Sequence, residues 1–195
     1  MLHSITLPYN FQPDKVGLFG NGVVSVEVRA DGIRLTRKRS EEDYSFADIA
    51  KITARGYASP TPIFIYVTIH IKVAAGSKPK KIELKLHPNL VDTNILLGAH
   101  RDYILGADFP NRLGILDEIE LGGLGASIRL RGERIVLGDR AYLHSDVESF
   151  THNQNGFYDL KLRPLKPKLG ISPEYAQNIL ATQAILHAII ERNQS

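Results

Sequence analysis

Cysteine and tryptophan are absent from this 195-residue chain, and methionine occurs once. Without cysteine the chain has no disulfide, no thiolate nucleophile and no cysteine-based zinc site. Its most apolar stretch, IFIYVTIHIKV, is interrupted by Thr68, His70 and Lys72, and it is far shorter than the roughly 18 apolar residues of a membrane span. The N-terminal residues lack the pattern of a secretory signal peptide, so we expect a soluble, cytoplasmic protein.

A strong excess of one charge is also missing. The chain has 24 basic and 21 acidic residues, which give a formal net charge of +3. The longest basic run, Arg37-Lys38-Arg39, is followed at once by acidic residues at 41–43, which partly cancel its field. Because nucleic-acid binders concentrate basic residues on one face, this small excess does not predict a nucleic-acid partner.

What the sequence does contain is a repeat. VEVRADGIRLTRKR, residues 26–39, and IRLRGERIVLGDR, residues 128–140, match at an offset of 102, with apolar residues alternating on both sides of a short glycine-containing turn. This alternation predicts a β-hairpin in each copy. At an offset of 98 the match continues, with YSFADIAKI at 44–52 aligned to YLHSDVESF at 142–150.

Each copy then continues in the same order. In the first copy TPIFIYVTIHIKV and KKIELKLH predict a second hairpin, with Gly76 to Pro79 as its turn and His70 opposite Lys85; the counterpart in the second copy shrinks to residues 156–165. Helix signals follow: Asn89 begins the first helix and Gly106 ends it, and Ser172-Pro173 begins the second. With a linker at 106–114, we expect two units, 1–108 and 109–195.

Antiparallel strands followed by one C-terminal helix, an early hairpin carrying DGIRL, and the rhythm of Phe46, Asp48 and Ile49 together resemble a pleckstrin-homology-like (PH/GRAM-like) domain, twice in tandem. The resemblance implies a mostly β protein, in which each unit is a seven-stranded bent sheet or partial barrel closed by one helix. The patterns identify about five strands in the first copy and four in the second. Further strands are expected in HSITLPYNF and DEIELGG, or else one copy is truncated. The resemblance also implies binding of proteins, peptides or lipid headgroups, and no catalysis.

Two groups of residues are candidate sites. His144 and Asp146, on one face of a predicted strand, and the nearby His152 form a weak candidate metal site; the alternative is that the repeated aspartate has a role at a strand end. The second group is basic and would bind an anion if its two loops converge, the alternative being solubility and edge protection. It contains Arg37, Lys38, Arg39, Lys78, Lys80 and Lys81.

The prediction is therefore a non-catalytic adaptor that binds another protein through an open sheet edge or the groove beside its last helix, with no cofactor. Self-association is a further expected use of the second copy. The first alternative is a binder of an anionic membrane surface or a phosphate-bearing ligand through the basic loops. The weaker alternative is a metal-assisted enzyme that depends on His144 and His152.

Overall fold

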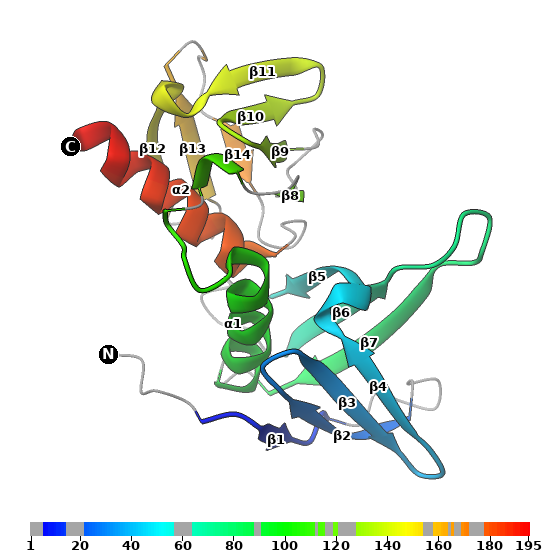
Figure 1. The fold of residues 1–195 in the computed structure, drawn as a ribbon. Helices are drawn as coiled ribbons and strands as arrows, with labels where there is room; N and C mark the ends of the chain where they lie inside the picture. The colour runs from blue at the N-terminus through cyan, green and yellow to red at the C-terminus, as the bar shows by residue number, and fades with distance from the viewer. Residues whose placement is uncertain are drawn as a thin grey trace.

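The computed structural model describes residues 6–14, 22–56, 64–87, 91–111, 113–115, 119–120, 128–153, 158–163, 165, 169–171 and 178–195. Within these residues the protein is mostly β: four small antiparallel sheets and two α-helices (Figure 1). The sheets and helices occur in two successive sets along the chain. We call the part that ends with the first helix the first half, and the remainder the second half.

The first half begins with a four-stranded sheet. Its strands pair in chain order: β1 (Tyr9–Phe11), β2 (Val23–Val28), β3 (Gly32–Arg37) and β4 (Glu41–Ser45). Alternate residues of β2 and β3 are buried, as the predicted hairpin requires. Gly32 is required at its position because a Cβ atom there would lie 2.2 Å from the carbonyl oxygen of Tyr44.

A short 3-10 helix, η1 (Phe46–Asp48), leads from this sheet into the next. The second sheet contains β5 (Ile49–Arg55), β6 (Ile65–Ile71) and β7 (Lys80–Leu86), and the helix α1 (Val91–Leu105) follows. The predicted register between β6 and β7 was wrong: His70 lies opposite Lys81, not Lys85. β6 ends at Ile71, before the predicted end at Val73, and residues 72–79 all belong to the connection.

The second half repeats this order. After the 3-10 helix η2 (Leu113–Ile115), a four-stranded sheet contains β8 (Ile119–Glu120), β9 (Ile128–Arg131), β10 (Arg134–Leu137) and β11 (Arg140–Leu143). The 3-10 helix η3 (His144–Asp146) leads into a three-stranded sheet of β12 (Val147–His152), β13 (Tyr158–Leu162) and β14 (Leu169–Ile171). The helix α2 (Ile179–Gln194) ends the chain.

Backbone hydrogen bonds recur at the positions that the sequence alignment pairs. The Phe46 amide donates to the Asp31 carbonyl at 2.8 Å, and the aligned His144 amide donates to the Glu133 carbonyl at 3.1 Å. Likewise the carbonyl oxygen of Asp48 accepts from Lys72, and that of Asp146 accepts from Arg163, both at 2.8 Å. The two copies therefore share the geometry of the corner between their sheets, where sequence identity between them is low.

Two of the strands that the patterns did not identify lie where further strands were expected, because β1 falls within HSITLPYNF and β8 within DEIELGG. The described strands thus give seven in each half. The expected partial barrel is not a continuous sheet: in the described residues each half has a four-stranded and a three-stranded sheet, and neither closes on itself.

The two halves share one cluster of buried apolar side chains. The helices α1 and α2 pack against each other (Figure 1). Asn178, just before α2, joins the halves by two hydrogen bonds to the Ile52 backbone: its amide donates to the Ile52 carbonyl at 2.9 Å, and its side-chain Oδ1 accepts from the Ile52 amide at 3.1 Å. Asn178 is buried and has a left-handed backbone with φ of 50°.

The helix predictions have mixed outcomes. Gly106 ends α1 with φ of 72°, as predicted, whereas the predicted starts at Asn89 and Ser172-Pro173 lie outside the described residues. α2 begins at Ile179, directly after the left-handed Asn178, so the predicted helix is not continuous from Ser172-Pro173. Neither described helix combines the length and apolar character needed to cross a membrane.

Candidate functional site

The outer face of the β5–β6–β7 sheet brings basic residues from all three strands together. Successive side chains of a strand point to opposite faces of the sheet, and those on the inner face of this sheet are buried and apolar. The register places the outward set in three rows, which we call the basic sheet face: Lys51, His70 and Lys81; Thr53, Thr68 and Glu83; Arg55, Tyr66 and Lys85.

Positive charge is concentrated on this face. Its four corners are Lys51, Lys81, Arg55 and Lys85, and its only carboxylate is Glu83. The face therefore carries an excess of three positive charges, which equals the formal net charge of the whole chain. Such a local excess produces a positive potential that the overall composition does not reveal.

The middle strand of the face carries no charge. Tyr66 is 48% exposed and lies between Arg55 and Lys85 in the neighbouring strands. Burial, and then the nearby ammonium groups of Lys51 and Lys81, lowers the pKa of His70, so its imidazole is neutral at pH 7. The centre of the face is therefore a neutral stripe bordered by cations.

The equivalent sheet of the second half shows that folding does not require these cations. On the outer face of β12–β13–β14 the positions are occupied by Ser149, Thr151, Asp159, Lys161 and Gly170. The single lysine there, Lys161, forms an ion pair with Glu148. In the described residues, the three-stranded sheet is thus built with a basic outer face in the first half and without one in the second half.

Both edges of the β5–β6–β7 sheet are contacted by other segments. Asn178 bonds to Ile52 on the free edge of β5, and the Asp14 amide donates to the Lys85 carbonyl on the free edge of β7 at 2.8 Å. These contacts obstruct the addition of a partner strand at those points. The outer face of the sheet is consequently the more accessible surface.

The predicted basic loops are brought together only in part. Glu42 accepts from the Arg37 Nε at 2.8 Å and lies 3.6 Å from the Lys80 Nζ, which also lies 4.9 Å from the centre of the Tyr44 ring. Hydrogen bonds from the Tyr44 hydroxyl and the Arg37 guanidinium hold the pKa of Glu42 below its usual value. Two of the predicted anion-binding residues are therefore already engaged by a carboxylate.

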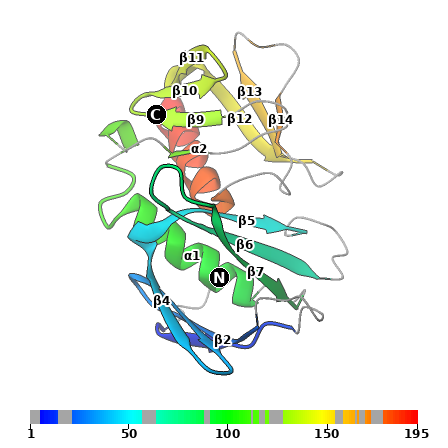
Figure 2. The same cartoon turned by 90° about the vertical axis from the view of Figure 1, so that its right-hand side faces the viewer.

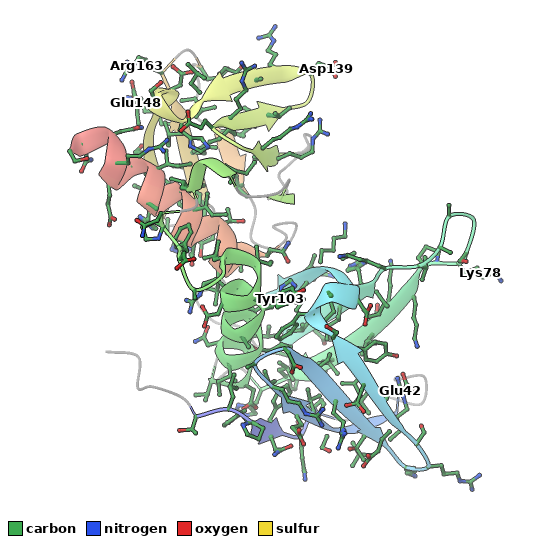
Figure 3. All side chains as sticks on the ribbon, viewed as in Figure 1. Glu42, Lys78, Tyr103, Asp139, Glu148 and Arg163 are labelled. Atoms are coloured by element: carbon green, nitrogen blue, oxygen red, sulfur yellow. The ribbon has the colours of Figure 1, made fainter. Side chains whose placement is uncertain are left out.

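The remaining loop residues lie at the ends of two separate hairpins. Lys38 and Arg39 are in the β3–β4 turn, and Lys78 is in the β6–β7 turn. Both views show these turns apart (Figures 1 and 2), and Figure 3 places Lys78 far from Glu42. Lys81 alone belongs to the basic sheet face. The loops thus approach each other at Glu42 and diverge at their ends.

The predicted metal residues occupy different environments. The His144 ring is buried in η3, with its Nδ1 3.0 Å from the Arg192 Nη2, and burial followed by Arg192 lowers its pKa to about 4. Asp146 accepts from the Leu143 amide at 3.0 Å, a strand-end role, whereas His152 is exposed and lies 4.9 Å from the Tyr158 ring. In the described ranges no group of three or more histidine, aspartate, glutamate or cysteine residues is arranged to hold a metal.

The sequence patterns predicted β6 and β7 as a hairpin but did not predict that β5 contributes the third strand of this face. The signal was present, since Lys51, Thr53 and Arg55 alternate with the apolar Ile52 and Ala54. Comparison with protein-family models and with curated proteins finds no match for this chain. Inference about function therefore depends on this geometry alone.

Proposed function

We propose that this chain is a non-catalytic binding protein made of two PH-like units, and that it binds a partner protein through the basic sheet face. The excess of basic over acidic side chains on the outer face of β5–β6–β7 is the observation that carries this proposal. A complementary acidic patch on the partner would speed association and fix the orientation of the complex.

The arrangement of elements supports the PH-like part of the proposal. In each half a four-stranded antiparallel sheet, a 3-10 corner and a three-stranded antiparallel sheet precede a single helix. The resemblance stated from the sequence implies this number and order of strands and a terminal helix. It also implies a module that binds rather than catalyses.

The joint between the halves supports a role in presentation. Asn178 ties α2 to β5 by two hydrogen bonds, and the core is continuous through both halves. A fixed second half would enlarge the body that carries the basic sheet face and restrict the directions from which a partner approaches. Rigid presentation lowers the entropic cost of binding.

Charge neutralisation tests the proposal. The face variant Lys51→Gln/Lys81→Gln and the loop variant Lys38→Gln/Arg39→Gln remove the same charge from different surfaces of the first half. Each is immobilised beside the unmodified chain and exposed to extract from the source cells, and retained proteins are quantified by mass spectrometry. Far-UV circular dichroism confirms that both variants are folded.

We expect a protein that is retained by the unmodified chain and by the loop variant, and lost by the face variant. Retention should fall as salt is raised, because exposed charges are screened beyond about 8 Å at physiological ionic strength. A face variant that retains the same proteins as the unmodified chain would refute the proposal.

An anionic membrane surface is the second candidate. The β6–β7 connection combines Lys78 with Val73, which is 42% exposed, and Lys38 and Arg39 lie in the turn of the separate β3–β4 hairpin. Basic and apolar side chains on projecting turns suit a bilayer surface. Sedimentation with vesicles of phosphatidylcholine and phosphatidylserine tests this candidate, which predicts that the loop variant, rather than the face variant, loses binding.

A further inference from the structure

The cations of the basic sheet face are not spread evenly. On β5 the order of outward residues is Lys51, Thr53 and Arg55, whereas on β7 Glu83 separates Lys81 from Lys85. Alternate residues of a strand lie about 7 Å apart. The β7 side of the face is therefore positive, negative and positive within about 14 Å.

Glu83 is exposed, and Thr68 lies opposite it on β6. No ion pair of the described residues joins Glu83 to either neighbouring lysine. Its carboxylate is thus available to a ligand that covers the face. A ligand that is negative throughout would bring an anion over this carboxylate, and like charges at an interface suppress binding.

We infer that the partner offers a protein surface of mixed charge, with carboxylates that meet the lysines at the edges of the face and a cation or hydrogen-bond donor that meets Glu83. This inference rests on the proposed function and specifies the ligand of the same face. A phosphodiester backbone and an anionic bilayer both lack the positive group. Protein surfaces supply both signs at the required spacing, and the exposed ring of Tyr66 offers them an apolar contact at the centre.

Defined probes test this inference. One fluorescein-labelled peptide carries four glutamates around a central lysine, and a second has glutamine in place of that lysine. Polyuridylate and vesicles containing phosphatidylserine represent the uniformly anionic ligands. Fluorescence anisotropy measures the peptides and polyuridylate, and sedimentation measures the vesicles, with the full chain and its Glu83→Gln variant. Asp139→Asn, in the β10–β11 turn of the second half, is the charge-matched control (Figure 3).

The expected result is tighter binding of the lysine-containing peptide than of the glutamine peptide, by about fivefold, which corresponds to about 1 kcal/mol. Glu83→Gln should abolish that preference, and Asp139→Asn should preserve it. Tighter binding of every probe by Glu83→Gln would overturn the mixed-charge inference. So would a lower dissociation constant for polyuridylate or the vesicles than for either peptide.

A different result would show that the proposed function itself is wrong. Lys51→Gln/Lys81→Gln should weaken binding of both peptides. If it changes neither, the basic sheet face is not a binding surface and the proposed function is wrong, whatever Glu83 does. If it weakens both while Glu83→Gln tightens them, the face binds anions and only the mixed-charge inference is wrong.

Discussion

Asn178 offers the most direct test of how the two halves are held together. Its side-chain Oδ1 accepts from the buried amide of Ile52, 126 residues earlier in the chain, and its own amide donates to the Ile52 carbonyl. The residue also has φ of 50°, a conformation that asparagine and glycine adopt more readily than alanine. Asn178→Ala removes the side-chain acceptor and adds backbone strain, whereas Asn178→Gly removes the acceptor alone.

The expected losses follow from these two effects. An Ile52 amide left buried without an acceptor costs about 1–3 kcal/mol in the free energy of unfolding. Alanine in the left-handed region adds about 1 kcal/mol. We therefore expect Asn178→Ala to destabilise the protein by about 2–4 kcal/mol, and Asn178→Gly to be the milder change by about 1 kcal/mol.

Urea unfolding followed by far-UV circular dichroism measures both variants. Asn10→Ala, on the exposed side of β1, is the control and should change stability by less than about 0.5 kcal/mol. If Asn178→Ala and Asn178→Gly both unfold at the urea concentration of the unmodified chain, the bonds to Ile52 do not join the halves. Equal destabilisation by the two would show that the left-handed backbone contributes nothing.

Three further predictions concern the first half. Burial, and then Lys72, lowers the pKa of His100 from 6.5 to about 4, so unfolding takes up a proton between these pH values and stability falls as the pH drops through this range. Between pH 7.5 and pH 5 the free energy of unfolding should fall by about 2 kcal/mol because of His100. In His100→Leu this part of the decrease should be absent. A pH dependence equal to that of the unmodified chain would contradict the assignment. Gly98→Ala, in the interior of α1 with nothing within 4 Å of the added Cβ, should stabilise by up to about 1 kcal/mol. Gly32→Ala should destabilise the chain in the same urea assay because its Cβ would collide with the Tyr44 carbonyl, and stability equal to the unmodified chain would refute this account.

Sequence patterns were sufficient to predict the β-rich class, the repeat, and which residues of most strands point inward. Apolar alternation with a period of two is local, so it identifies the inward face of a strand without knowledge of its neighbours. The alignment of Phe46 with His144 and of Asp48 with Asp146 predicted equivalent positions, which share the same backbone bonds at the two corners. The short strands β1 and β8 gave weaker signals, because few residues alternate within them.

Which side chains share a surface depends on tertiary contacts that sequence patterns do not encode. The register of β6 against β7 depends on the length of their connection. The predicted turn was too short, so it placed His70 opposite Lys85 instead of Lys81. The pairing of β5 with β6 brings Lys51 and Arg55 beside the neutral stripe, and that contact depends on strands being neighbours in the sheet. The bond from Asn178 to Ile52 depends on packing between the halves, a contact across 126 positions that no local pattern encodes.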